Sequence, residues 1–299
     1  MKRVTFSQAR TRPNLDFVLP GLLLGSVGLV VGQGAVGKTY LALHVGIGIP
    51  LGRPIAEANG EALWPAMESG KVAVILGEDP PEIVQDRLHS LRAGLQLDER
   101  DEEILDQDLE VVSFTDEDDD MRLALKNGSR LERGPFYETL RAFCEGRRLV
   151  IIDPLALVAL GLEEKDNGDM AQVMRMLAGI ARATECAILV LHHVGKSRDG
   201  GEEWEKARGA SSLTTSVRLQ VNLGPPTEDE CRDLSIPIDD RGMWVRVAQA
   251  KANYGAPAAP RLLRRAAGGV LRAMPASMLA GAGAAEAKQK KQGGRNGAI

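Results

Sequence analysis

The stretch "VVGQGAVGKTYLALHVG", residues 30–46, decides the fold of this chain. Two β-branched residues run into a glycine-rich turn, and an apolar helical pattern follows Lys38 and Thr39. Residues 32–39 fit the pattern GxxxxGK followed by Thr, in which glycines let backbone N–H groups turn inward around phosphate oxygens. The lysine adds a positive charge at the β- and γ-phosphates, and the threonine hydroxyl can ligate Mg²⁺. A glycine turn that matches by chance is the alternative, but a strand before and a helix after are the context that the motif requires.

We therefore predict a nucleotide-binding loop that continues into the first turn of a helix. The residues expected to contact the nucleotide in this loop are Gly32, Gly34, Ala35, Val36, Gly37, Lys38, Thr39 and Tyr40.

Short apolar runs alternate with helical patterns through the first two thirds of the chain. The expected strands cover residues 28–31, 72–76, 109–114, 149–152 and 188–191, and the expected helices cover residues 38–47, 81–95, 135–144 and 169–184. Such alternation predicts an α/β fold with a central, mostly parallel twisted sheet and helices on both faces. Further strands expected at residues 217–221, 243–250, 262–265 and 270–272 predict a C-terminal antiparallel extension of that sheet.

The 299 residues suffice for one large α/β domain with appendages or for two small domains. We expect a flexible polar arm over residues 1–14, one ATPase domain over residues 15–274, and a basic tail over residues 275–299 whose composition supports no packed core. The segments "GPPTEDE" and "PIDDRG" indicate turns or an inserted loop.

Charge is distributed unevenly along the chain. Residues 98–120 carry thirteen acidic residues and one basic residue, a local net charge of −12, which leaves +8 for the rest because the total is −4. The isoelectric point of about 5.7 argues weakly against nucleic-acid binding, and this asymmetry weakens the argument further. We expect the acidic stretch to be a solvated surface segment and not a metal site.

Three cysteines without a CxxC pair, and no secretory leader pattern, favour a reduced cytoplasmic location. The most apolar run, residues 17–31, is interrupted by Pro20 and by glycines, so we expect no membrane span.

Two further apolar runs end in carboxylates. "LVIIDPL" predicts a buried strand ending at Asp153, and a carboxylate at the C-terminal end of a parallel strand faces the ligand crevice, where it can hold Mg²⁺. "KVAVILGEDPP" ends at Glu78 and Asp79, where a strand-end carboxylate can polarise the attacking water. The alternatives are that Asp153 caps a turn and that Glu78 or Asp79 caps the helix beginning at the following prolines. Both roles can coexist, with Asp79 as the cap and Glu78 as the base.

A third run, "AILVLHHVGK", ends in a histidine pair. A histidine at a strand end can sense the γ-phosphate by hydrogen bonding, and the position of His193 favours this role. The alternative is a structural or accidental surface pair, and zinc is not expected because no suitable cysteine or carboxylate spacing is nearby.

The order strand–phosphate loop, strand–Glu, strand–Asp and strand–His resembles the RecA-like ATPase core. The motifs "LDFVLPG", "EDPP" with "RLHSL", "EGRRLVIIDPL", "LHHVGK", "RGASSL" with "VR", and "AKANYGAP" with "GGVL" together resemble the RepA-type hexameric replicative helicases of broad-host-range plasmids. The resemblance covers roughly residues 15–271. The first and third motifs of the core occur in all P-loop ATPases, whereas "EDPP", "RGASS" and "KANYG" are much more specific.

The resemblance implies a ring-shaped, hexameric DNA helicase that uses ATP and Mg²⁺ to translocate on single-stranded DNA and to unwind the duplex during plasmid replication. The plasmid's initiator and primase proteins are its implied further partners. The site residues that it implies are Lys38 and Thr39 on the phosphates and Mg²⁺, Glu78 as the catalytic base, Asp153 on Mg²⁺, His193 as the sensor, Arg87 at the nucleotide, and Arg218 as an arginine finger for the neighbouring subunit. Residues 116–130 and the Ala/Gly-rich tail have no counterpart in the family.

Two assignments keep an alternative. Cationic residues in the loop 195–208 suit single-stranded DNA in a ring channel, but the three glutamates among them equally suit a solvated mixed-charge loop. These candidate DNA contacts are Lys196, Arg198, Lys206 and Arg208. Arg218 can instead pair with a carboxylate of its own sheet, which would leave Lys251 or Arg208 as the trans-acting cation.

Two other classes of function share this core. One is a recombinase or regulatory protein in which ATP acts as an assembly switch without processive unwinding, although the short arm shows no oligomerisation strand of the kind that filament-forming recombinases carry. The other is an accessory ATP-binding protein, because translocation has no sequence motif of its own.

Overall fold

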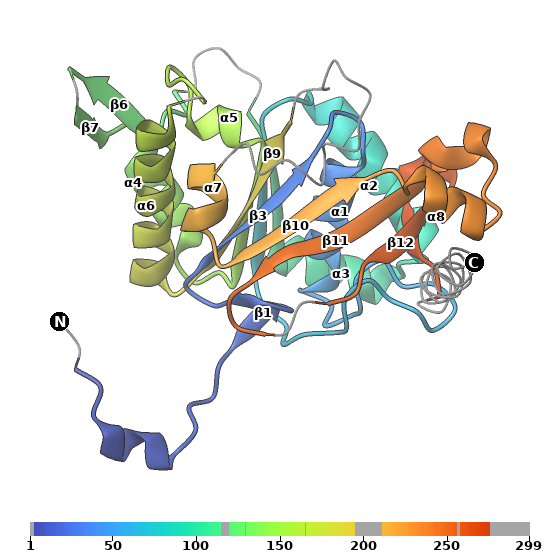
Figure 1. Ribbon diagram of the computed structural model, residues 1–299, viewed down its shortest axis with the longest axis horizontal. Coiled ribbons are helices and arrows are strands. Elements are labelled where there is room, and N and C mark those ends of the chain that lie inside the picture. The colour runs from blue at the N-terminus through green and yellow to red at the C-terminus, as the bar shows by residue number, and fades with distance from the viewer. Residues whose placement is uncertain are drawn as a thin grey trace, which may run out of the picture.

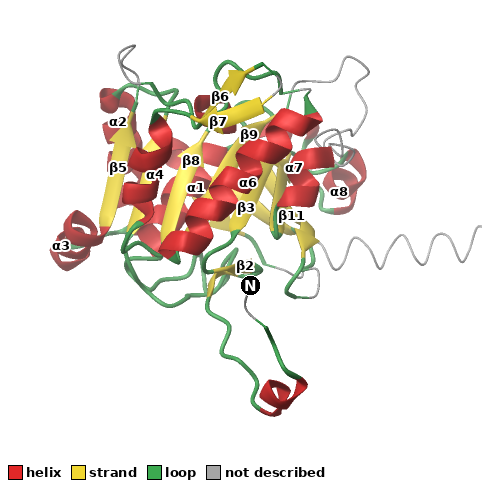
Figure 2. Cartoon of the chain, turned by 90° about the vertical axis from the view of Figure 1, so that its left-hand side faces the viewer, coloured by secondary structure: helices red, strands yellow, loops and turns green. Residues whose placement is uncertain are grey.

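A nine-stranded sheet runs through the middle of the molecule, with helices on both of its faces (Figures 1 and 2). The computed structural model describes residues 3–114, 120–128, 130–164, 166–194, 211–255 and 258–275. The order of strands across the sheet is β13-β12-β11-β10-β3-β9-β8-β4-β5. The predicted α/β fold is therefore confirmed.

The central part of the sheet is parallel, and its edge on one side is antiparallel. The parallel strands are β10 (Leu219–Gly224), β3 (Val27–Gly32), β9 (Ala187–His193), β8 (Leu149–Asp153), β4 (Val72–Leu76) and β5 (Leu109–Ser113). The antiparallel strands are β11 (Trp244–Ala252), β12 (Arg261–Arg265) and β13 (Leu271–Ala273). Each strand overlaps a predicted one, and the parallel core and a C-terminal antiparallel extension are confirmed. The placement of the strand predicted at residues 217–221 in that extension is wrong, because β10 pairs parallel with β3 and the extension begins only at β11.

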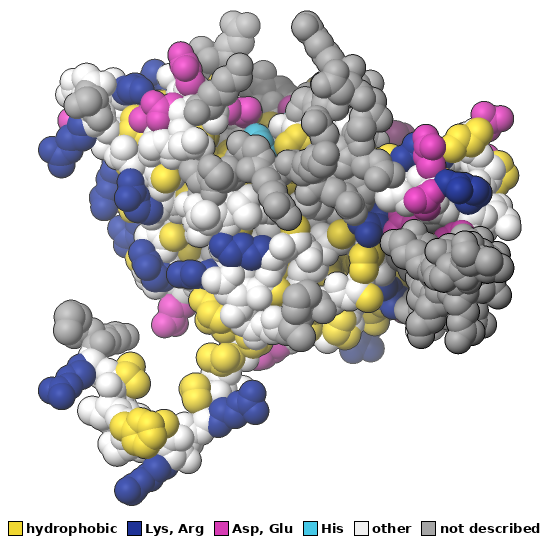
Figure 3. Space-filling model, in the orientation of Figure 1, with side chains coloured by type: hydrophobic (Ala, Val, Ile, Leu, Met, Phe, Trp, Pro, Cys, Tyr) yellow, Lys and Arg dark blue, Asp and Glu magenta, His cyan; other side chains and the backbone are white. Residues whose placement is uncertain are grey.

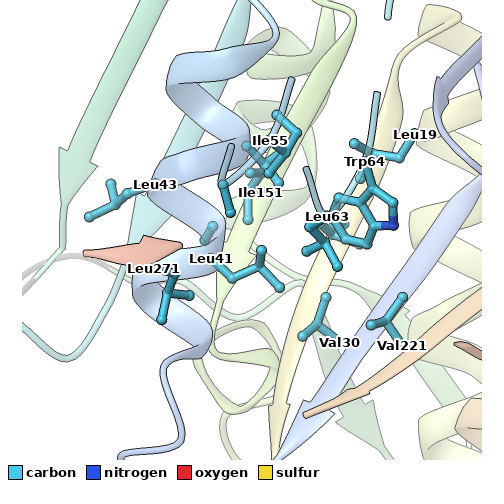
Figure 4. Packing of buried hydrophobic residues seen from close by; sticks show 14 of the residues in the cluster. Leu19, Val30, Leu41, Leu43, Ile55, Leu63, Trp64, Ile151, Val221 and Leu271 are labelled. Atoms are coloured by element: carbon cyan, nitrogen blue, oxygen red, sulfur yellow. The ribbon is translucent and has the colours of Figure 1, made fainter. Parts of the chain in front are cut away.

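Alternate side chains of each central strand enter two separate cores. In β4, Val74 and Leu76 pack in one cluster, whereas Ala73 and Ile75 pack in the other. The first core is covered by α1 (Lys38–Gly48), α2 (Pro81–Leu95) and α3 (Glu99–Asp108), and Figure 4 shows its side chains around α1. The second is covered by α4 (Phe136–Cys144), α5 (Leu155–Val158), α6 (Asn167–Thr184) and α7 (Ser211–Ser216). Among the helices that the structure describes, none is both long and apolar enough to cross a bilayer.

The acidic stretch begins with a surface helix. Its first part forms α3, which begins with a capping box in which the Asp98 side chain accepts from the backbone N–H of Asp101. Asp101 is buried and receives a hydrogen bond of 2.8 Å from Arg53. Asp101 is the only buried acidic residue in the described part of the stretch, so the expectation of a solvated surface segment holds there except at Asp101. Residues 115–119 lie outside the described residues.

Several short elements were not anticipated. They are the hairpin of β1 (Phe17–Leu19) and β2 (Leu22–Leu23), the hairpin of β6 (Ala124–Asn127) and β7 (Arg130–Arg133), α5, α8 (Glu228–Asp233), and the 3₁₀ turns η2 (Ile238–Met243) and η3 (Ala267–Gly269). The segments expected to be turns or a loop near residues 224–242 thus contain α8 and η2. A capping box at Thr227 explains why so short and polar a helix forms there.

The segment ahead of β1 projects away from the body of the protein (Figures 1 and 2). It holds the 3₁₀ turn η1 (Phe6–Arg10), and Val4 and Phe6 are 84% and 96% exposed. Figure 3 shows hydrophobic and basic side chains together on this segment. The predicted tail lies outside the described residues from position 276 onward.

A buried histidine joins the C-terminal extension to α1. The Nε2 atom of His44 accepts a hydrogen bond of 3.0 Å from the backbone N–H of Leu271 in β13. Burial and, to a smaller extent, the positive charge of Arg272 together lower the pKa of His44 to about 4. His44 is therefore neutral in the folded protein at neutral pH, and its ring acts as the acceptor that this backbone N–H needs.

This histidine should make stability depend on pH. Because its pKa is lower in the folded than in the unfolded chain, the unfolded chain takes up the proton first as the pH falls below about 6.5, and the stabilisation is lost progressively down to about pH 4. Between pH 7 and pH 5 we expect a loss of about 2 kcal/mol that His44→Gln does not share. Denaturant unfolding of both proteins at the two pH values measures the difference, and parallel losses would contradict it.

Candidate nucleotide-binding site

The phosphate loop joins β3 to α1 at the carboxyl end of the parallel strands. A Cβ atom on Gly32 would lie 2.7 Å from Val36 Cγ1 and 2.8 Å from the carbonyl oxygen of Leu223, so only glycine fits where the strand enters the loop. Ala35 and Gly37 have φ values of 61° and 102°, in the left-handed region. The loop thus has the tight turn that lets backbone N–H groups surround a phosphate.

The side chain of Lys38 is folded into this loop. Its Nζ donates to the carbonyl oxygens of Gly32 at 2.9 Å and Gln33 at 2.8 Å, and lies 3.1 Å from Nδ1 of His193. Only 3% of the residue is exposed. Burial lowers the pKa of Lys38, while the nearby carboxylates of Asp153 and Glu78 raise it. A buried cation therefore stands at the place where the motif puts the phosphates.

Thr39, in the first turn of α1, contacts Asp153 at the carboxyl end of β8. The Thr39 hydroxyl donates to Asp153 Oδ2 at 2.6 Å, while Asp153 Oδ1 is buried without a hydrogen-bond partner. Burial raises the pKa of Asp153, and the hydrogen bond from Thr39 lowers it. A hydroxyl beside a carboxylate with one unsatisfied oxygen suits Mg²⁺, which takes oxygen ligands, keeps several waters and shares substrate phosphates. The residues fit this ion although the described part of the chain has no group of three or more His, Cys, Asp or Glu arranged as a metal site.

Glu78 and His193 complete one side of the site. Glu78 Oε2 lies 3.5 Å from His193 Nε2, which in turn lies 3.9 Å from Asp153 Oδ1. The Glu78 side chain is 56% exposed, so a water molecule can reach it. The ends of β4, β8 and β9 thus bring together the predicted base, Mg²⁺ ligand and sensor beside the loop.

The neighbouring carboxylate has a different role from the predicted one. The N-cap residue of α2 is Pro80, without a side-chain cap, so the expectation that Asp79 caps this helix is wrong. Both oxygens of Asp79 instead accept from Arg87, one at 2.9 Å. The guanidinium carbon of Arg87 also lies 5.8 Å from the ring centroid of Tyr40. Asp79 and Arg87 therefore form an ion pair beside the loop.

Arg218 lies at the other end of the sheet. It precedes β10, whose Leu219 pairs with Gly28 at the start of β3, whereas the loop follows Gly32 (Figure 1). Four residues of strand separate these levels by about 13 Å. The Arg218 side chain is exposed and, among the described residues, makes no ion pair or hydrogen bond, so the alternative of a carboxylate partner in its own sheet is not observed. Lys251, the other proposed cation, donates to the carbonyl oxygen of Thr214 at 2.7 Å.

One arginine beside the loop was not found by sequence reasoning. Arg265, at the end of β12, donates from Nη2 to the carbonyl oxygen of Ala35 at 2.8 Å. Its sequence signal is weak, because a basic residue at a strand end is common on any surface. The candidate DNA contacts Lys196, Arg198, Lys206 and Arg208 lie outside the described residues.

Comparison with known proteins agrees with this geometry. Residues 2–199, about two thirds of the chain, match a family model described as an AAA domain. The chain belongs to this AAA domain family. Like the phosphate loop itself, the match identifies an ATP-binding P-loop protein.

Beyond the family, the fold of this AAA domain protein resembles that of a solved structure. The crystal structure of the RadB recombinase superposes with a TM-score of 0.51 at 14% identity, covering 85% of this chain and 93% of that one. At that identity the likeness concerns the fold alone. The AAA domain protein therefore has the predicted RecA-like ATPase fold.

Asp153 should matter more for the ligand than for the fold. Asp153→Asn removes a buried charge and keeps an oxygen that can accept from Thr39, so the melting temperature of the nucleotide-free protein should not fall. The tightening of ATP binding by Mg²⁺ should shrink by about tenfold or more. Calorimetric titrations with and without Mg²⁺ measure this effect, with the exposed Asp233→Asn as the control. An unchanged Mg²⁺ dependence in Asp153→Asn would rule out the assignment.

Proposed function

We propose that this RecA-like ATPase is a replicative DNA helicase, a ring of six subunits that hydrolyses ATP to move along single-stranded DNA and unwind the duplex during plasmid replication. The observation that carries the proposal is the separation of two groups of residues. Lys38, Thr39, Glu78, Asp153 and His193 gather around the phosphate loop, while Arg218 is exposed at the opposite end of the sheet. An arginine so placed is too far from its own loop to act there, so an arginine-finger role for Arg218 requires the loop of a neighbouring subunit, as in a ring.

The residues around the loop suit phosphoryl transfer to water. The ammonium group of Lys38 would face the phosphates, and Thr39 with Asp153 would hold Mg²⁺, which would supply charge neutralisation at the phosphate oxygens. Glu78 is exposed enough to accept a proton from the attacking water. His193 lies between Lys38 and Glu78, at 3.1 Å and 3.5 Å, and is placed to respond to the γ-phosphate and to link that response to the base.

The helicase motifs "EDPP", "RGASS" and "KANYG" support unwinding as the output of hydrolysis. Single-stranded DNA and the plasmid's initiator and primase proteins are the partners that follow from that likeness. In this proposal the cations of the loop 195–208 contact the DNA backbone within the ring. The second candidate is a recombinase-like or regulatory protein in which ATP only switches assembly, and the likeness to the RadB fold is equally compatible with it.

A strand-separation assay distinguishes the helicase from the recombinase-like or regulatory switch. Single-stranded DNA should stimulate ATP hydrolysis by the purified protein, and a forked duplex should then be separated in an ATP-dependent manner. Glu78→Gln should still bind ATP but hydrolyse it about a hundredfold more slowly or worse, because it lacks the base, and it should not open the fork. Stimulated hydrolysis without strand separation would favour the switch, and normal hydrolysis by Glu78→Gln would point to another base, with Asp79 as the first to test.

Arg218 should act across a subunit interface. Arg218→Ala should bind ATP normally but lose about a hundredfold or more in hydrolysis, because an arginine finger stabilises charge in the transition state. Lys38→Ala should be inactive through loss of the cation in the loop. Mixing the two variants, under conditions in which subunits exchange, should restore part of the activity, because some interfaces regain both an intact loop and an intact arginine.

The exposed Arg175→Ala, on α6, is the matched control and should hydrolyse ATP normally. A fully active, ring-forming Arg218→Ala protein would exclude Arg218 and leave Lys251 or Arg208 as the trans-acting cation.

A further inference from the structure

A second cation contacts the phosphate loop, and it comes from the C-terminal extension. The guanidinium of Arg265, the last residue of β12, donates to the carbonyl oxygen of Ala35 at 2.8 Å. A Cβ atom on Gly37 would stand 3.4 Å from both of its Nη atoms, an ordinary packing distance, so the guanidinium also lies beside Gly37. Arg265 therefore covers residues 35–37 of the loop. It lies beyond residues 2–199, the part of the chain that matches the AAA domain family.

The turn after β12 holds Arg265 in this place. Gly268 and Gly269 have φ values of 68° and 81°, a backbone conformation that residues other than glycine rarely adopt. A Cβ on Gly269 would lie 2.7 Å from the ring of Tyr40, and one on Gly268 would lie 2.6 Å from Ser90 Oγ. Two glycines thus let the turn pack closely on α1 and α2, and this packing fixes the end of β12 against the loop.

The charge of Arg265 is not balanced within the described residues. Arg265 makes no ion pair there, and its Nε is buried without a hydrogen-bond partner. Burial lowers its pKa from the usual value, but a guanidinium remains protonated in proteins. Arg87, the arginine expected at the nucleotide, is instead paired through two hydrogen bonds with Asp79. Of these two arginines, Arg265 is the one whose charge remains for a bound anion.

The backbone that Arg265 holds is also unusual. Ala35 has a φ of 61°, in the left-handed region that residues with a Cβ rarely enter. A hydrogen bond from a charged donor to its carbonyl oxygen stabilises that conformation. The same contact keeps the carbonyl turned toward Arg265.

We propose that Arg265 is a positioning residue for the nucleotide: it holds the phosphate loop in its binding conformation through Ala35 and adds positive charge to the site for the polyphosphate of nucleoside di- and triphosphates. The antiparallel extension is then part of the nucleotide site and not only an addition to the edge of the sheet. This inference rests on nucleotide binding by the proposed ATPase and is independent of unwinding.

Binding of Mg²⁺–ADP to the full-length protein tests the proposal without turnover. Arg265→Gln should bind ADP about tenfold more weakly at low ionic strength, and the deficit should shrink as salt is added, because screening weakens the charge that the variant lacks. Arg265→Lys should recover most of the affinity. Arg264→Gln removes the same charge from the adjacent residue, whose guanidinium carbon lies 5.7 Å from the ring centroid of Trp244, and should change affinity by less than about twofold.

The outcomes are distinguishable. Equal affinities of wild type and Arg265→Gln would overturn the role of Arg265 while leaving the proposed ATPase intact, whereas a wild-type protein that does not bind ADP would remove the proposed function as well. Suppose that Arg265→Lys binds ADP as weakly as Arg265→Gln, and that the deficit in affinity of both variants relative to the wild type does not shrink as salt is added. The residue then acts through packing alone and the proposal fails. If thermal unfolding shows that Arg265→Gln does not fold, Arg265→Lys decides: wild-type affinity supports the proposal, and a large loss in the folded variant overturns it.

Discussion

The hydrogen bond from the Thr39 hydroxyl to Asp153 is the interaction on which the site depends. It joins the first turn of α1 to the end of β8, two strands away from β3 in the sheet. It satisfies only one oxygen of a carboxylate that is 4% exposed, and the other oxygen has no partner. A buried charge in this state is costly, so the apolar strands beneath it must supply the stability that the polar end of the sheet does not.

Neighbouring polar groups of the site likewise lack the partners that would satisfy them fully. His193 Nε2 is buried without a hydrogen bond, and Lys38 donates to carbonyl oxygens of its own loop and not to a carboxylate. Unsatisfied polar atoms are uncommon in folded proteins, and their concentration beside a phosphate loop is what a site made for a charged ligand requires. The ligand would complete contacts that the protein alone leaves open.

The length of the strands also separates Arg218 from the residues around the loop. Groups at the carboxyl ends of β4, β8 and β9 converge on the loop, whereas Arg218 precedes β10, about 13 Å along the strands from the level of the loop. The antiparallel strands of the C-terminal extension also contact α1 and the phosphate loop. Its contacts through His44 with Leu271, and through Arg265 with Ala35, make β12 and β13 part of the environment of α1 and its loop.

Local sequence determined the elements of the parallel core, because strands buried on both faces are continuous apolar runs and the helices between them carry clear periodicity. It also determined the phosphate loop and the strand-end positions of Glu78, Asp153 and His193. It did not reveal α3 or α8, since such polar helices are set by capping and by single contacts such as that between Arg53 and Asp101. Only the tertiary structure decided that Asp79 pairs with Arg87 instead of capping α2, and that Arg265 meets the loop. The reason is physical: these partners come from different elements, and their distances depend on how the elements pack, which no local pattern of residues encodes.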